Sequence, residues 1–148
     1  MYVDTSIKRP GHCDGSYIYV LEYITKSGQV CTISGAGREE NVSRQRLELT
    51  AILTAAKRIG KTSAVRVITP CGGILAPVKN GWLEKWEGNG WKNGKNEPVH
   101  NADLWQQLAE IMKKHTFSEE KREHAYGKWM ETELKRMEEK KNTGGTKE

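Results

Sequence analysis

The sequence predicts a mixed α/β fold, in which helices cover a sheet that contains both parallel and antiparallel strands. Two observations support this prediction. The chain opens with short runs of β-branched and aromatic residues separated by turn residues, a pattern typical of a β-meander. An amphipathic helical segment and a further β-branched run then follow. The order strand, helix, strand favours a right-handed crossover, which places two strands side by side and parallel.

The first half of the chain provides the meander, one helix and one further strand. Strand-forming runs occupy three stretches: 1–7, 17–24 and 30–33. Turn residues separate these runs at 8–11 and 26–28. A helix is expected over 43–59 because apolar residues recur there at helical spacing, namely Leu49, Ile52, Leu53, Ala56 and Ile59. A strand is expected over 64–69, ended by Pro70.

The second half begins with helical segments. Residues 74–90 are expected to form short helices, with Pro77 and Gly81 as interruptions. Asn101 is expected to cap a helix that continues through Lys114, because asparagine is a favoured residue at helix N-termini.

The C-terminal segments are less regular. Residues 116–122 fit either a polar fifth strand or the lead-in to the last helix, which is expected over 124–141. Residues 142–148 are too polar to pack and are expected to be disordered. The folded domain is therefore expected to span residues 1–141.

Composition narrows the class of protein. The 148 residues carry a net charge of +5, which suits a polyanionic partner but says nothing about fold. The three cysteines, Cys13, Cys31 and Cys71, have no metal-binding spacing, so we expect reduced, mostly buried thiols. The chain has neither a signal-peptide pattern nor a membrane-spanning apolar run. We expect a cytoplasmic monomer that does not bind membranes.

Aromatic and basic residues are interleaved in a polar, glycine-rich segment. Trp82, Trp86 and Trp91 alternate with three lysines, Lys85, Lys92 and Lys95. Ammonium groups can bind phosphates, and flat rings can stack on sugars or bases, so the pattern predicts a nucleic-acid contact. A packing role is the alternative. Trp82 is expected to pack between helices, whereas Trp86 or Trp91 either reaches nucleic acid or packs in the same way. Trp105 and Trp129 are expected in the core or at its edge.

The chain resembles the type 1 ribonuclease H family. The resemblance rests on the segment from Trp82 to Leu108, whose basic aromatic loop is called the handle in that family and is followed by Asn101-x-Asp103-Leu104-Trp105. It also rests on Arg46-x-Glu48-Leu49 in the first helix, Asp4 in the first strand and His124-Ala125 before the last helix. The resemblance implies a three-layer ribonuclease H-like fold with a five-stranded mixed sheet.

The resemblance also implies a chemistry. Members of the family hydrolyse the RNA strand of RNA/DNA hybrids with two Mg²⁺ ions, or Mn²⁺, held by four carboxylates. Asp4 matches the first metal-binding carboxylate and Glu48 the second. His124 matches a histidine that assists product release or proton transfer.

Two of the four expected carboxylates are not found. Pro70 stands at the third position, and proline offers neither a carboxylate nor an N–H group. Thr132 stands at the fourth, between Glu131 and Glu133. One step along a helix turns a side chain by about 100°, so neither glutamate replaces the missing acid automatically. Cys71 is a poor substitute ligand, because a thiolate is soft and Mg²⁺ is hard.

Further residues are candidates for substrate contact. Arg44 and Gln45 stand where the family usually has amides, so Gln45 is expected near a 2′-hydroxyl and Arg44 near a phosphate. Trp86, Trp91, Lys92 and Lys95 are the expected contacts in the handle. The turn after the first strand, 7–12, is basic where the family has glycines.

The candidate residues also have structural interpretations. Asp4 can form an ion pair with Arg44, Arg46 or another nearby base, and Glu48 and His124 can be ordinary surface residues. We expect a ribonuclease H-like protein that engages RNA/DNA hybrids and whose hydrolytic activity is weakened or lost. The alternatives are a non-catalytic nucleic-acid-binding module and a protein-interaction domain.

Overall fold

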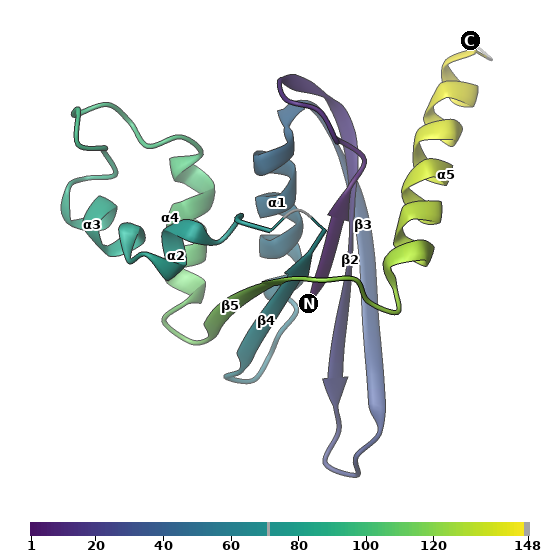
Figure 1. Ribbon diagram of the computed structural model, residues 1–148, viewed down its shortest axis with the longest axis horizontal. Coiled ribbons are helices and arrows are strands. Elements are labelled where there is room, and N and C mark those ends of the chain that lie inside the picture. Colours follow the sequence, from purple (N-terminus) through teal and green to yellow (C-terminus); the bar gives the residue numbers. More distant parts are fainter. Residues whose placement is uncertain (71, 147–148) are drawn as a thin grey trace.

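The computed structural model describes the backbone of residues 1–70 and 72–146, with side chains as far as residue 140. Cys71 lies outside the described residues. The chain forms one five-stranded sheet in the order β3-β2-β1-β4-β5. Helices lie on both faces of this sheet (Figure 1). The mixed three-layer α/β fold predicted from the sequence is therefore confirmed.

The N-terminal meander matches its prediction in topology but has longer strands. It consists of β1 (Tyr2–Thr5), β2 (His12–Ile24) and β3 (Val30–Ser43). β2 pairs antiparallel with both β1 and β3. In Figure 1 the β2–β3 hairpin extends well past the other strands at its turn.

β3 continues through glycines that look like a strand break in the sequence. Gly35 lies opposite Tyr19 and Gly37 lies opposite Tyr17 in the β2–β3 register. Each tyrosine ring crosses the neighbouring glycine, and a Cβ atom there would overlap the ring. The two glycines therefore make room for rings from β2.

The central helix and strand form the predicted crossover. Helix α1 (Arg44–Ala56) begins after Ser43, whose hydroxyl accepts a hydrogen bond from the backbone N–H of Arg46 at 3.2 Å. Strand β4 (Ala64–Thr69) follows and lies parallel to β1, with Tyr2 opposite Ile68.

The second half has the predicted elements, with two corrections that concern Pro77 and Asn101. It contains α2 (Ala76–Lys79), α3 (Trp82–Gly88), α4 (Ala102–Ile111), β5 (Thr116–Lys121) and α5 (Gly127–Thr146). The ambiguous segment is a strand, β5, parallel to β4. Pro77 lies inside the first turn of α2, where its missing N–H costs nothing, so it does not interrupt a helix. Asn101 precedes α4, but its side chain does not cap the helix.

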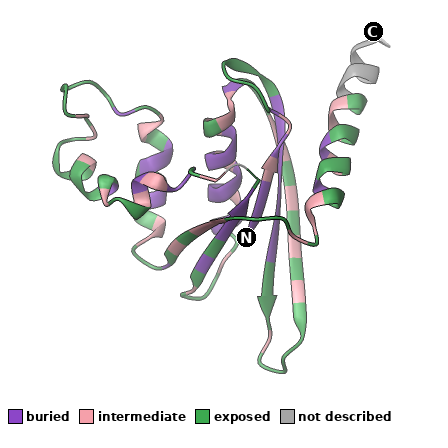
Figure 2. Ribbon diagram, viewed as in Figure 1, coloured by how far each residue is buried: buried purple, intermediate pink, exposed green. Residues whose placement is uncertain are grey.

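Two apolar clusters hold the layers together. The larger lies between the sheet and α1 and α4, and it includes the fully buried Trp105, which confirms the core position expected for this residue. The smaller joins β1, β2 and β4 to α5 through Met130 and Leu134. Figure 2 shows buried residues concentrated along the sheet and on the inner sides of α1 and α4.

The expectations about the cysteines, about membrane-spanning helices and about the C-terminal tail have different outcomes. Cys13 and Cys31 are free thiols, but Cys13 is exposed, contrary to the expected burial. No helix in the described part of the chain is long and apolar enough to cross a membrane. The predicted disorder of 142–148 stays a prediction for residues 147–148, which lie outside the described residues, whereas the backbone of 142–146 continues helix α5.

Candidate active site and nucleic-acid interface

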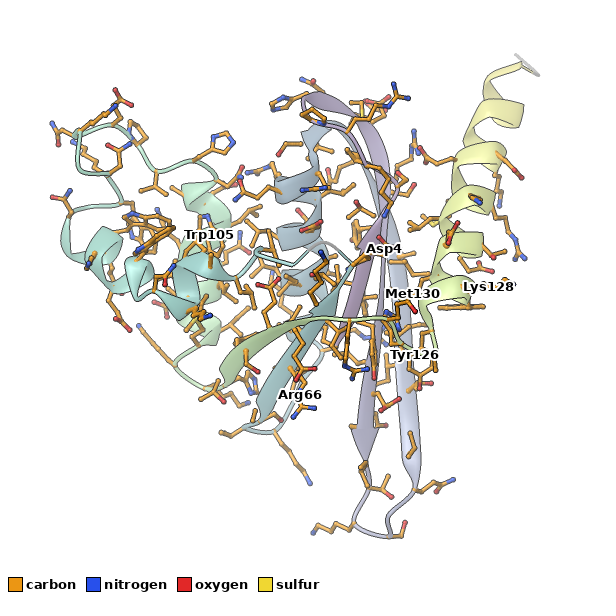
Figure 3. All side chains as sticks on the ribbon, in the orientation of Figure 1. Asp4, Arg66, Trp105, Tyr126, Lys128 and Met130 are labelled. Atoms are coloured by element: carbon orange, nitrogen blue, oxygen red, sulfur yellow. The ribbon has the colours of Figure 1, made fainter. Side chains whose placement is uncertain are left out.

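The topology of the sheet creates a site at the ends of β1 and β4. After these two neighbouring parallel strands, the chain goes to opposite sides of the pair: β1 leads to β2 on one side, and β4 leads to β5 on the other. Ligands of open α/β sheets bind at such points, outside the carboxyl ends of the strands. Asp4 lies next to the end of β1, and Pro70 follows β4 directly. Figure 3 shows Asp4 on the sheet between the layers of α1 and α5.

Asp4 is nearly buried and carries an ion pair. Its side chain is 14% exposed, and its Oδ1 atom accepts hydrogen bonds from the backbone N–H of Thr5 at 2.8 Å and from Nζ of Lys8 at 2.5 Å. An ion pair, the structural alternative to metal binding by Asp4, is thus present. Its partner is Lys8 from the turn after β1, while Arg46 pairs with Asp103.

Glu48 projects from α1 toward the same site. Its side chain is 10% exposed and lies 3.7 Å from Nε of Arg44. Burial raises the pKa of Glu48 to about 7, and the positive charges of Arg44 and Lys8 oppose this rise. The negative charge of Asp4 raises the same pKa further, so Asp4 lies within electrostatic range of Glu48.

The raised pKa makes folding stability depend on pH. The folded-state pKa of about 7 lies above the ordinary value of 4.5 for Glu48, so the folded protein holds the proton more tightly. The resulting stabilisation is complete below about pH 4.5 and is lost as the pH rises through about 7. We expect the free energy of unfolding to fall by on the order of 2 kcal/mol across this window.

Urea denaturation in EDTA at several pH values measures this effect. Glu48→Gln keeps the shape of the side chain but cannot ionise, so its curve should lack this part of the pH dependence. If the variant and the wild type lose stability in parallel as the pH rises, Glu48 does not carry the effect.

His124 lies beside the N-terminal strand. Its ring packs at a tilt on Tyr2, with centroids 4.4 Å apart, and its Nδ1 atom accepts a hydrogen bond from the backbone N–H of Tyr126 at 3.2 Å. Burial lowers the pKa of His124, as does the charge of Arg122, whereas the charge of Asp4 raises it. The half-buried ring is therefore within electrostatic range of Asp4. The role in product release or proton transfer stays a prediction.

The third and fourth carboxylate positions hold no acid. Pro70 is an exposed residue in the bend after β4. On α5, the Thr132 hydroxyl donates to the carbonyl oxygen of Lys128. Glu131 pairs with Lys135 at 3.2 Å and Glu133 with Arg136 at 3.3 Å, two contacts within the helix. Among the described residues no three histidine, cysteine or acidic side chains gather closely enough to hold a metal ion.

These observations test the fit of a metal. Asp4 and Glu48 supply hard oxygen atoms, and Mg²⁺ is often bound by one or two carboxylates together with water and substrate phosphates. The two residues therefore fit one divalent ion that also binds substrate. They do not fit a pair of ions, which would need further carboxylates at the positions of Pro70 and Thr132.

The first turn of α1 is linked to α4 by side chains. Arg46 forms a two-pronged ion pair with Asp103, at 2.9 and 2.6 Å, and also donates to Oδ1 of Asn101. The amide of Asn101 donates to Oε1 of Gln45 at 3.0 Å. This network explains why Asn101 does not cap α4. It also fixes the exposed Gln45 beside Arg44, so the two predicted substrate contacts adjoin each other.

In the handle, residues 82–99, the tryptophan that is most exposed is not one of those predicted to be. Trp82, expected to pack between helices, is 41% exposed. Trp86 and Trp91 are partly buried against the main core, and Trp86 lies between the rings of Trp82 and Trp105. The backbone explains the position of Trp91, whose N–H donates to the carbonyl oxygen of Trp86 at 2.7 Å and which has a positive φ of 61°.

The lysines of the handle are solvent-exposed, as a phosphate contact requires. Lys92 and Lys95 are both exposed, and an isolated bridge between Lys92 and Pro98 closes the loop that carries them. The amide of Asn93 organises the tip, because its Oδ1 atom accepts hydrogen bonds from the backbone N–H groups of Lys95 and Glu97. The loop therefore holds two cations on a hydrogen-bonded scaffold.

Two residues of the site are not predicted from the sequence. Lys8 is recognised there only as part of a basic turn. Glu119 on β5 lies on the inner side of the sheet, where its carboxylate accepts hydrogen bonds from the backbone N–H groups of Ile74 and Leu75, both at 3.0 Å. It fixes the segment that follows Pro70, and its charge also raises the pKa of Glu48. The alternation of inward residues along β5 is the signal that could have identified it.

Comparison with known proteins decides the family. A family model described as RNase H matches residues 1–125. The chain belongs to the RNase H family. The match includes Asp4, Glu48 and His124 and ends two residues before α5 begins. Members of this family generally use divalent metal ions.

Individual ribonucleases H match this chain over part of their own length. The ribonuclease H of Syntrophomonas wolfei is 39% identical over 98 residues, covering 65% of this chain and 67% of that protein. Ribonucleases H of Thermoanaerobacter and Caldicellulosiruptor saccharolyticus are 38% and 39% identical. The chain spans 52% and 59% of their respective lengths.

Solved structures share the fold. LC9-RNase H1, a type 1 RNase H with the type 2 active-site motif, has a TM-score of 0.69 and 20% sequence identity, over 88% of this chain and 67% of that one. A foamy viral protease-reverse transcriptase in complex with an RNA/DNA hybrid has a TM-score of 0.59 and 18% identity, over 81% of this chain and 17% of that one. At these identities the likeness concerns the fold alone.

Proposed function

We propose that this RNase H family protein binds RNA/DNA hybrids and hydrolyses the RNA strand slowly, with a single Mg²⁺ or Mn²⁺ ion at Asp4 and Glu48. The observation that carries the proposal is the half-complete carboxylate site. Asp4 and Glu48 act on each other at the ends of the central strands, while Pro70 and a threonine stand at the other two positions.

Hybrid binding is supported by two surfaces. At the start of α1, the 43% exposed side chain of Arg44 adjoins Gln45, so a cation and an amide can meet a phosphate and a 2′-hydroxyl. The handle adds the exposed Lys92 and Lys95. A structural relative, the foamy viral protease-reverse transcriptase, is known in complex with an RNA/DNA hybrid, which makes a hybrid the first substrate to test here.

The residues of the site have separate tasks in this proposal. A bound divalent ion would act as a Lewis acid on the scissile phosphate. Asp4 and Glu48 would hold it, and because protons compete with a metal for a carboxylate, the raised pKa of Glu48 favours activity above neutral pH. His124, with Nδ1 occupied as an acceptor, keeps its Nε2 atom for proton exchange with a leaving group or with water.

A non-catalytic hybrid-binding module is the second candidate. It is favoured by Pro70, which supplies no ligand, and by the ammonium group of Lys8, which already neutralises Asp4. Both candidates predict the same binding surface. They differ only in whether the RNA strand is cut.

Two assays with the same labelled hybrid separate the candidates. Affinity is measured in EDTA at several salt concentrations, beside double-stranded DNA and RNA of the same sequence. Cleavage is then measured with Mg²⁺ and with Mn²⁺. Binding with metal-dependent cleavage supports the first proposal, and binding without cleavage supports the second. A protein that binds none of the duplexes contradicts both and favours a protein-interaction domain.

Removing the charges of the handle should weaken hybrid binding. For Lys92→Ala with Lys95→Ala we expect roughly tenfold lower affinity at moderate salt and a smaller salt dependence, by about one unit of slope per lost phosphate contact. Trp91→Ala with Lys92→Ala tests the aromatic contribution, although Trp91 also packs on the core. Thermal unfolding therefore accompanies each measurement.

A matched pair on α5 controls for general effects of charge. Lys128 and Trp129 are adjacent and exposed, so they resemble the handle in composition. Trp129 is 45% exposed, which corrects the expectation that it lies in the core or at its edge. Lys128→Ala with Trp129→Ala should change affinity less than the handle variants. Equal losses in both regions would sink the assignment of the handle as the contact.

A further inference from the structure

A lysine side chain lies where the site would receive a cation. Lys8 comes from the turn between β1 and β2, and its Nζ atom lies 2.5 Å from Oδ1 of Asp4. Its positive charge is also felt by Glu48. The ammonium group therefore places positive charge near both carboxylates that would bind a metal ion.

The remaining charges of the site reinforce this arrangement. Arg44 lies 3.7 Å from Glu48, so each carboxylate has a cationic side chain at hand. Close-packed carboxylates repel one another unless a cation lies between them. In this protein the side chains of Lys8 and Arg44 place positive charge beside the two carboxylates.

We propose that Lys8 is an intramolecular counter-ion of Asp4 that a divalent cation must displace, so that this lysine sets the metal affinity of the site. The inference rests on the proposed function in taking Asp4 and Glu48 as the metal ligands. It goes further in naming the residue that opposes metal binding.

The side chain of Lys8 is suited to being displaced. It is 55% exposed, whereas Asp4 is 14% exposed, so the ammonium group can leave while the carboxylate stays in place. Lysine is a flexible point charge rather than a rigid fork, which lets it exchange partners readily. A nucleic-acid phosphate is an alternative partner of the right charge. Binding of a hybrid would then free Asp4 for the metal, and by linkage the metal would equally favour the hybrid.

Manganese binding to the protein without nucleic acid tests the proposal directly. Free Mn²⁺ is followed by electron paramagnetic resonance, or its heat of binding by calorimetry, for the wild type and Lys8→Met. Methionine keeps the length of the stem and removes the charge. We expect roughly tenfold tighter Mn²⁺ binding in Lys8→Met, the size expected from removing one unit charge a few ångströms from a divalent ion near water. Lys8→Gln should behave in the same way.

Lys113 provides the matched control. It is an exposed lysine in an ion pair with Glu110 on α4, at 2.8 Å, and its removal changes the net charge by the same amount. Lys113→Met should leave Mn²⁺ affinity within about twofold of the wild type, since screening weakens distant charges. Adding Asp4→Asn to Lys8→Met should abolish the gain.

Three results would overturn the proposal. These results are Mn²⁺ binding in Lys8→Met that is no tighter than in the wild type, an equal gain in Lys113→Met, and a gain that survives the addition of Asp4→Asn. The proposed function fails separately, through loss of hybrid affinity in EDTA, where no metal is bound. A protein that binds no hybrid but gains Mn²⁺ affinity in Lys8→Met would therefore keep the inference and lose the proposed function.

Discussion

Asp4→Asn is expected to reduce metal-dependent cleavage of the RNA strand by at least about 100-fold. An amide cannot supply the negative charge that holds a divalent ion, and a metal that stabilises charge on a phosphate contributes several kcal/mol to catalysis. About 2.7 kcal/mol corresponds to 100-fold in rate. The fold should survive, since the oxygen of asparagine can still accept the hydrogen bond from the N–H of Thr5.

The measurement is single-turnover cleavage of a labelled RNA/DNA hybrid in Mg²⁺ and in Mn²⁺. Asp14→Asn is the matched control, because Asp14 is exposed on β2 and its Oδ1 atom likewise accepts a backbone N–H, from Asn41 at 2.9 Å. That variant should cleave like the wild type. Hybrid affinity in EDTA should be kept in both variants, since the charge of Asp4 opposes phosphate binding.

Cleavage that persists unchanged in Asp4→Asn would show that the activity comes from another site or from a contaminating nuclease. In either case Asp4 would not hold the metal ion on which the cleavage depends, and the proposed site would be non-catalytic. The same experiment therefore tests the catalytic proposal and guards against its most common artefact.

The fold was predictable from the sequence because its elements have strong local signals. The apolar spacing of α1 and the β-branched residues of β4 each indicate one structure, and β4 has the predicted bounds of 64–69. The glycines of β3 conceal their strand, because the tyrosine rings that cover them come from β2. A contact between strands cannot be read from one segment alone.

The site was predictable only where a motif fixes it. Asp4 and Glu48 lie in segments that resemble the family, and the structure brings them into one electrostatic environment. The part played by Lys8 depends on the path of the turn after β1, which composition does not determine. Which tryptophans of the handle are exposed likewise depends on tertiary packing, since the backbone of Trp91 itself has a positive φ and its side chain turns inward.

The last helix shows why a substitute for a missing carboxylate cannot be identified from the sequence alone. Glu131 and Glu133 flank the expected position, and both form ion pairs with basic residues of α5. Glu138 does face the sheet, where it pairs with Arg38 and accepts a hydrogen bond from Ser16 at 2.7 Å. The position of an acidic residue on α5 therefore does not by itself make it part of the site at Asp4.

Pro70→Asp is expected to increase cleavage by about 10- to 100-fold and to tighten Mn²⁺ binding. The change places a carboxylate directly after β4, at the third position of the site, and one well-placed charge on a metal is worth about 1.4–2.7 kcal/mol on this scale. The substitution is accommodated locally, since Pro70 is exposed and any residue can follow the extended Thr69. Thr132→Asp, added to Pro70→Asp, tests the fourth position in the same way.

Pro70→Asn separates the new charge from the loss of the proline ring. It has nearly the same shape as aspartate and frees the backbone equally, but it is neutral. If only Pro70→Asp gains activity, the weakness of the wild type comes from a missing ligand, and Asp4 and Glu48 already lie where a metal needs them. If both variants gain equally, the rigid proline is the obstacle. If neither gains, the limit lies elsewhere, and Lys8→Met combined with Pro70→Asp asks whether the resident ammonium group at Asp4 imposes it.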